Sequence, residues 1–297
     1  MFEVVILGTL LVIAILGAPV LDGLERKLKA KVHSRLGPPI LQTWYDILKL
    51  LRKEIILPAN VRIVLYLVPL YYGLVCLLVL FTMLGIIGLP NIYSIAFIII
   101  TIAFAQGIFV IIPVLCSNPF SIVGSMREVA LMLINEVALA VALTLLAYFA
   151  NSLNLSDIIH LSYTPSYIVL ALLIIVATYV LAGRVPFDIA EAEPELASGI
   201  LIELSGPLLG IFIYGNLIKR LAVSMLASYI ILAPLLGGVS HLVTLCLTLI
   251  LAGVIWLLYA LTAVILARSR VDLAPTTLFK IFLTLSVISV ILRHLGL

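Results

Sequence analysis

The sequence predicts an all-α polytopic membrane protein, and three observations lead to this fold class. Hydrophobic residues make up 64% of the chain and charged residues only 10%. A typical soluble domain has about 45–50% apolar and about 25% charged residues. Apolar stretches recur that match the roughly 20 residues needed to cross a bilayer as a helix. Lys and Arg concentrate in alternate connections between these stretches, as the positive-inside rule describes. We therefore expect residues 1–297 to form a single integral membrane domain.

Eight transmembrane helices account for the apolar stretches. Their expected bounds are 2–24, 64–88, 92–116, 128–150, 166–183, 204–235, 241–267 and 274–293. The first stretch does not read as a cleaved signal peptide, because its basic cluster follows it instead of preceding it. The stretch 204–235 is long enough for two crossings, but a ninth helix would place Arg268 and Arg270 on the side that is poor in Lys and Arg. The sequence favours one long, tilted helix there, with both termini outside and loops 25–63 and 184–203 in the cytoplasm.

The basic loop 25–63 contains an amphipathic segment. In residues 40–53, the apolar side chains Ile40, Leu41, Trp44, Ile47, Leu48 and Leu51 share one helical face, and polar side chains occupy the other. This pattern is typical of a helix that lies in the membrane interface, with Trp44 as an anchor. The loop can act simply to fix the topology, or it can also form a platform for a peripheral subunit.

The positions of the cysteines and histidines limit which cofactors this chain could hold. The three cysteines are isolated in apolar stretches, whereas an iron–sulfur cluster requires about four thiolates. The four histidines form no pair suited to haem, and no glycine-rich phosphate-binding loop is present. We expect no cofactor and no metal in this chain itself, so any redox chemistry must belong to partner subunits.

The loop 184–203 is unusually acidic for a cytoplasmic connection. It contains five of the fourteen carboxylates of the chain, namely Asp188, Glu191, Glu193, Glu195 and Glu203. Pro186 and Pro194 are expected to bracket a short turn of helix that stacks several of these carboxylates. Stacked, partly buried carboxylates repel one another, which raises their pKa values and favours sharing of protons.

Charged residues also lie inside the predicted membrane helices. Ser125 and Glu128 match a capping box, which favours a capping role over a pathway role for Glu128. Glu136 lies about 12 Å deeper by helix rise, and an intramembrane carboxylate is a functional candidate by default. Lys219 and Arg220 lie in the middle of the 204–235 helix. These residues can form a proton or ion pathway with the acidic loop, or they can be structural ion pairs.

Three segments resemble the family of the complex I membrane component known as the H subunit. They are ERKLKAKVHSRLGP at 25–38 with YDILKLLRKE at 45–54, SMREVALMLINE at 125–136, and RVPFDIAEAEPELASGILIELSG at 184–206. The last segment resembles the most specific signature of the family. The short loop after RLGP and the shorter chain resemble the hydrogenase branch, in particular the membrane subunit (the M subunit) of archaeal energy-converting membrane-bound nickel–iron hydrogenases.

The resemblance implies roles and partners. Glu136, Glu203 and the acidic loop would lead from the redox arm toward antiporter-like membrane subunits. Docking to the peripheral arm would involve Glu25, Arg26, Arg35, Asp46, Lys49 and Arg184. The arm would contain hydrogenase-like large and small subunits and an iron–sulfur subunit, which would carry the nickel–iron centre and the clusters. Membrane lipid would surround the chain, and no nucleic acid is expected to bind.

The function expected from the resemblance is that of a coupling subunit in a ferredoxin-dependent, hydrogen-evolving hydrogenase that translocates protons or sodium ions. The equivalent subunit of a sulfane-sulfur-reducing or quinone-reducing relative is an alternative. A free-standing secondary transporter is a third interpretation, but such proteins usually show internal repeats, and the acid-rich loop has no counterpart in the first half of the chain.

Overall fold

The computed structural model describes residues 2–56, 62–88, 93–116, 118–190 and 199–296, and every regular element in these residues is a helix. Seven helices are long and apolar enough to cross a membrane, and an eighth is apolar but shorter. The prediction of an all-α polytopic membrane protein is therefore confirmed. The long helices are α1 (Phe2–Val32), α3 (Val64–Ile87), α4 (Ser94–Leu115), α5 (Pro119–Ala150), α8 (Gly206–Leu232), α9 (His241–Ile265) and α10 (Leu273–His294), and the shorter one is α6 (Pro165–Leu181).

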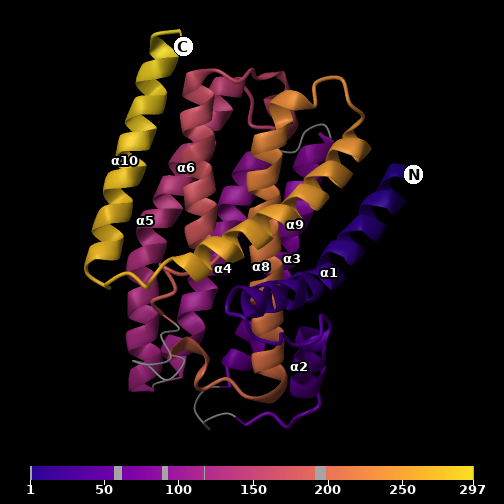
Figure 1. Cartoon of the computed structure of the whole chain (residues 1–297), viewed down its shortest axis with the longest axis vertical. Coiled ribbons are helices and arrows are strands. Elements are labelled where there is room, and N and C mark those ends of the chain that lie inside the picture. The colour runs from indigo at the N-terminus through magenta and orange to yellow at the C-terminus, as the bar shows by residue number, and fades with distance from the viewer. Residues whose placement is uncertain (1, 57–61, 89–92, 117, 191–198, 297) are drawn as a thin grey trace.

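Helix α8 forms the centre of the bundle. It packs against α1, α2, α3, α6 and α9. In its most apolar stretch 78% of the residues are buried, more than in any other spanning helix described. The predicted single long helix is confirmed: α8 is continuous through Lys219 and Arg220, and the 3₁₀ turn η3 (Ala233–Leu235) follows it. In Figure 1, α3 to α6, α8 and α10 run close to the long axis, whereas α1 and α9 cross it obliquely.

Helix α5 begins at Pro119, well before the predicted start at residue 128, so the capping-box interpretation of Ser125 and Glu128 is wrong. The N-cap is Asn118, whose side-chain oxygen accepts a hydrogen bond of 3.0 Å from the Phe120 amide. An Asn cap followed by Pro at the first helical position is a strong start signal. Ser125 lies inside the helix and donates to the Ser121 carbonyl oxygen at 2.8 Å. Glu128 is therefore a mid-helix side chain.

The predicted basic loop is partly helical. Helix α1 continues to Val32 instead of ending near residue 24, and the amphipathic helix α2 (Gln42–Leu51) forms as expected. Helix α2 packs against α8: Ile47 is buried, and the ring centroids of Trp44 and Tyr214 lie 5.6 Å apart. Part of its apolar face therefore binds protein, while Leu48 and others remain exposed.

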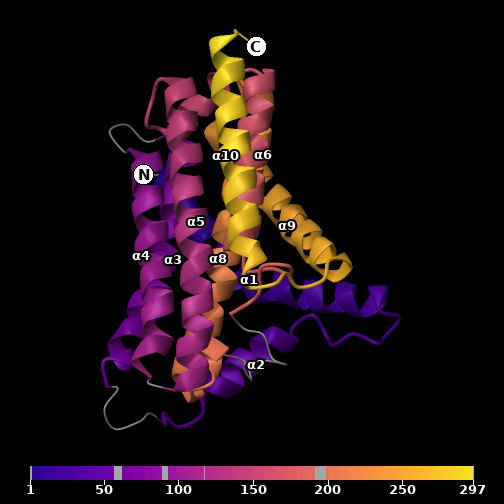
Figure 2. The same ribbon diagram turned by 90° about the vertical axis from the view of Figure 1, so that its left-hand side faces the viewer.

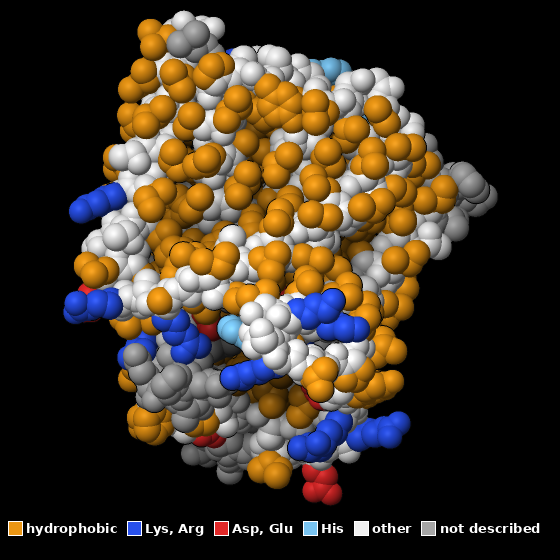
Figure 3. Space-filling view, viewed as in Figure 1, with side chains coloured by type: hydrophobic (Ala, Val, Ile, Leu, Met, Phe, Trp, Pro, Cys, Tyr) orange, Lys and Arg blue, Asp and Glu red, His pale blue; other side chains and the backbone are white. Residues whose placement is uncertain are grey.

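The chain ends and the loops sort to two ends of the bundle. Both termini lie toward the upper end in Figure 1, and Figure 2 shows the same arrangement from the side. On the visible face in Figure 3, Lys and Arg side chains gather in the lower half, below a mostly apolar upper half. This asymmetry is what the positive-inside rule requires, and the assignment of the lower end to the cytoplasm stays a prediction.

Residues 33–41 return tightly over α1, and Gly23 makes this possible. A Cβ atom at Gly23 would lie 1.8 Å from the carbonyl oxygen of Ile40, whereas a Cβ at Gly17 of the same helix would meet nothing within 4 Å. We predict that Gly23→Ala lowers the free energy of unfolding by about 1–3 kcal/mol, because the returning segment must move. Gly17→Ala should be neutral or stabilising by up to about 1 kcal/mol. Thermal unfolding of both variants in one detergent tests this, and equal melting temperatures would contradict it.

Candidate functional site

A small polar cavity joins the acidic loop to the middle of α8. Its volume is about 20 Å³, which is enough for roughly one water molecule. Its polar lining comes from α5, the acidic loop and α8, and consists of Glu128, Asp188, Asn216, Lys219 and Arg220. Four residues singled out from the sequence as charged and oddly placed thus meet at one point. Glu128, which the sequence favoured as a cap, belongs to this cavity instead.

The described part of the acidic loop is tied to the connection between α9 and α10. Asp188 forms an ion pair of 3.2 Å with Arg268, and Ser269 donates to the Pro186 carbonyl oxygen from both its amide and its hydroxyl. Glu191, Glu193 and Glu195 lie outside the described residues. The predicted carboxylate cluster is therefore described only at its two ends, Asp188 and Glu203.

Glu203 lies in the turn before α8 and not within the helix. The side-chain amide of Asn118 donates a hydrogen bond to the Glu203 carboxylate. Because Asn118 also caps α5, this bond connects the end of the acidic loop to the start of the helix that carries Glu128 and Glu136. No sequence signal indicates this contact, since the two residues are 85 positions apart.

Lys219 is almost fully buried, with 4% of its surface exposed. Its ammonium group donates to the side-chain oxygen of Gln106 at 3.1 Å and lies 4.4 Å from the ring centroid of Phe109. A buried cation requires such partners, because an uncompensated charge in an apolar interior is very unfavourable. Gln106 is a functional candidate that the sequence reading missed, although a lone amide in a predicted membrane helix is itself a usable signal.

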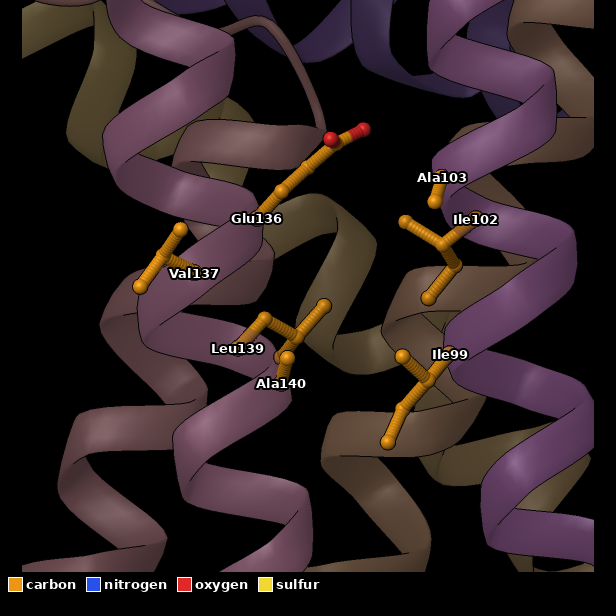
Figure 4. Close-up of a pocket in the computed structure, with 7 residues that line it drawn as sticks. All are labelled: Ile99, Ile102, Ala103, Glu136, Val137, Leu139 and Ala140. Carbon is orange, nitrogen blue, oxygen red and sulfur yellow. The ribbon is translucent and has the colours of Figure 1, made fainter.

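Glu136 lies on the face of α5 that looks toward α4. It lines a cavity of about 210 Å³ whose other lining residues are Ile99, Ile102, Ala103, Val137, Leu139 and Ala140. Figure 4 shows the Glu136 carboxylate extending from α5 into the space between the two helices. One carboxylate oxygen of Glu136 is buried without a hydrogen-bond partner in the described part of the chain.

A second charged cluster is centred on Glu25. The Glu25 carboxylate forms a bidentate ion pair with Arg184, accepts a 2.8 Å hydrogen bond from Trp256 Nε1 and pairs with Lys29 at 2.8 Å. These contacts join α1, the start of the acidic loop and α9. Arg220 lies next to the cluster and donates to the Ala182 carbonyl oxygen at 3.0 Å.

The burial of Glu25 and Arg184 changes the interpretation of these two residues, which were predicted to dock a peripheral arm. Glu25 and Arg184 are 2% and 6% exposed and bind each other, so they offer little surface to a partner. Arg35 and Lys49 are exposed and remain candidates for docking.

Arg26 forms ion pairs with Asp22 at 2.9 Å and with Asp46 at 3.1 Å. The sequence reading missed Asp22, although a carboxylate four residues before an Arg on one helix face is a recognisable pairing signal. The Arg26–Asp46 pair fastens α2 to α1 next to the exposed basic segment, and the Asp22–Arg26 pair lies within α1. Among the described residues, no group of three or more His, Cys, Asp or Glu side chains could hold a metal ion.

Comparisons with known proteins cover nearly the whole chain. The NADH dehydrogenase family model matches residues 4–294. Formate hydrogenlyase subunit 4 of Escherichia coli (strain K12) is 31% identical over 274 residues, covering 87% of this chain and 88% of the relative. The H subunit of NADH-quinone oxidoreductase from Cupriavidus metallidurans is 28% identical over 297 residues, covering 89% and 83%.

A solved structure has the same fold. It is that of the membrane-bound sulfane sulfur reductase (MBS), an archaeal respiratory membrane complex, in which one chain aligns with a TM-score of 0.85 and 20% identity over 98% of this chain and 99% of that chain. At this identity the likeness concerns the fold alone.

The Glu25 cluster leads to a stability prediction. Glu25→Gln would leave the Arg184 guanidinium buried without its counter-charge, and removing one partner of a buried ion pair typically costs about 3–5 kcal/mol. Asp272→Asn is the matched control, because the Arg270–Asp272 pair spans 3.9 Å between exposed side chains and such pairs contribute at most about 1 kcal/mol. Thermal unfolding in detergent should separate the two variants clearly, and a wild-type melting curve for Glu25→Gln would remove the assigned role.

Proposed function

The chain belongs to the NADH dehydrogenase family, and on that premise we propose that it is the membrane anchor and coupling subunit of a ferredoxin-dependent, hydrogen-evolving membrane-bound hydrogenase. It would link redox chemistry in a peripheral arm to translocation of protons or sodium ions across the plasma membrane. The observation that carries this proposal is the polar cavity at which Glu128, Asp188, Lys219 and Arg220 meet. It connects a loop at one end of the bundle with charged groups deep in the membrane region.

The exposed basic segment supports docking of the arm. Arg35 and Lys49 are exposed, and α2 is fixed to the bundle through the Arg26–Asp46 ion pair and its packing on α8. A rigid helix beside exposed cations offers a defined surface to a peripheral subunit. The partner subunits would hold the nickel–iron centre and the iron–sulfur clusters, and this chain would hold and move protons or respond to charge.

The first step of the coupling would occur at the acidic loop. A change in charge in the arm would alter proton occupancy at Asp188 and its neighbouring carboxylates, because interacting groups titrate as a set. Asp188 lines the same cavity as Glu128, and the cavity has room for about one water that could pass a proton between polar groups.

The second step would carry the change to the α4–α5 face. Glu128 lines the cavity, and Glu136 lies eight residues further along α5, about 12 Å by helix rise, so a change in charge at the cavity alters the field at Glu136. Glu136 faces the groove between α4 and α5, where Phe104 and Val137 are exposed. An antiporter-like subunit placed against this face would receive the change.

Two relatives supply alternatives for the final acceptor. The sulfane sulfur reductase complex contains a chain of the same fold, so the equivalent subunit of a sulfane-sulfur-reducing complex is the first alternative. The NADH-quinone oxidoreductase relative is 28% identical, slightly less than the 31% of formate hydrogenlyase subunit 4, and a quinone-reducing complex is the second alternative. Sensitivity of the purified complex to quinone-site blockers distinguishes the quinone alternative from the other two.

The coupling role of Glu136 can be tested in sealed vesicles that contain the whole complex. Glu136→Gln keeps the shape of the side chain but cannot carry a proton, so we predict that ion translocation slows by roughly a hundredfold while the peripheral redox reaction continues. Glu203→Gln should weaken coupling in the same way. Asp272→Asn removes an exposed carboxylate outside the pathway and should leave the ion gradient unchanged. A full gradient in Glu136→Gln vesicles would exclude this residue from the pathway.

A further inference from the structure

A second polar cavity lies at the opposite end of the bundle from the acidic loop. Its volume is about 220 Å³, and its lining includes His160, Ser162, Thr164 and Arg293, with the rings of Phe149 and Tyr167 beside them. Thr164 caps the start of α6, and the acidic loop follows the end of the same helix. The two sites are therefore separated by the length of α6, about 25 Å by helix rise. In the proposed topology, the cavity would lie near one membrane–water boundary.

The cavity is suited to an anion. In the described part of the chain, the one hydrogen bond of Arg293 goes from its guanidinium to the Phe149 carbonyl oxygen at 3.3 Å, and no described carboxylate forms an ion pair with it. A guanidinium has five N–H donors, so this contact at the end of α5 leaves most of them available. The Ser162 hydroxyl makes no side-chain hydrogen bond among the described residues. The first turn of α6 adds the partial positive charge of a helix N-terminus.

An apolar groove lies further along the same helices, α5, α6 and α10. The groove has a volume of about 160 Å³, lies between these three helices, and is lined by residues that include Ala138, Val141, Phe282 and Ser286. Ser286 and Phe282 precede Arg293 by seven and eleven residues, and Ala138 precedes Phe149 by eleven, so they lie on the same helix faces as the polar lining. By helix rise, the groove begins about 10 Å from Arg293. Figure 2 shows α5, α6 and α10 side by side along this path.

We propose that the cavity and the groove together form a binding site for an anionic phospholipid, with the headgroup phosphate at Arg293 and one acyl chain between α5 and α10. Arg suits a phosphate because its planar donors match two phosphate oxygens. Helix α10 exposes Phe279, Leu283 and Ile291, which is the surface that lipid covers. An inorganic phosphate would use only the polar cavity and would leave the apolar groove without an occupant, so the paired cavities favour the lipid.

The test uses the detergent-purified complex that contains this chain, titrated with phosphatidylglycerol and monitored by native mass spectrometry. Ser162→Asp places a negative charge in the cavity at a residue whose side chain makes no hydrogen bond among the described residues, and Arg293→Gln removes the cation. Each should weaken phosphatidylglycerol binding at this site by about tenfold, the scale of one charge-assisted hydrogen bond. Lys280→Gln is the matched control, because Lys280 is an exposed cation on α10 outside both cavities, and it should bind as wild type does.

A competition experiment distinguishes a lipid headgroup from free inorganic phosphate as the group that binds in the cavity. Phosphatidylglycerol should remain bound in millimolar inorganic phosphate, and Ala138→Phe, which fills the groove, should weaken lipid binding without touching the polar cavity. Displacement of the lipid by inorganic phosphate together with normal binding by Ala138→Phe would overturn the lipid assignment. Unchanged lipid binding in both Ser162→Asp and Arg293→Gln would overturn the site as a whole.

Discussion

The requirement that every charge inside an apolar bundle find a partner determines most of this structure. Glu25 is 2% exposed, and an unpaired carboxylate at that depth would be strongly destabilising. Its partners Arg184 and Trp256 come from positions 159 and 231 residues away. Satisfying this one carboxylate therefore joins α1, the start of the acidic loop and α9. The oblique course of α1 and α9 brings both helices to this point (Figure 1).

The same requirement places the candidate pathway. Lys219 is held by Gln106 and by the ring of Phe109, and it lines the cavity that also contains Glu128 and Asp188. A buried cation beside these carboxylates couples them, because a change in charge on one group alters the field at the others. Glu136, with one buried oxygen lacking a hydrogen-bond partner in the described residues, is the group most able to respond.

The sequence predicted the parts of the fold that depend on local patterns. Hydropathy placed the eight apolar helices, charge asymmetry identified α8 as one continuous helix, and the 3.6-residue periodicity identified α2. It misplaced the start of α5, because the S-x-x-E pattern at Ser125 matches a capping box, whereas the N-cap in the structure is Asn118, seven residues earlier. It also ended α1 too early, since its basic segment reads as a loop when the returning residues 33–41 that pack over Gly23 are not considered.

The sequence identified several residues of the candidate site, but it did not identify the contacts between them. Charge in an apolar context singled out Glu136, Lys219 and Arg220, whereas the Glu25–Arg184 pair and the Asn118–Glu203 bond join distant positions. No local pattern encodes such pairs, because they follow from how whole helices pack.

The measurement that tests the central claim most directly is to tag this chain, extract it gently, and assay the co-purifying complex for nickel and for hydrogen evolution from reduced ferredoxin. The proposed coupling role predicts both nickel and hydrogen evolution in the purified complex. Iron–sulfur partners without nickel would contradict the hydrogenase assignment, and a chain that purifies alone and moves ions by itself would contradict the coupling role.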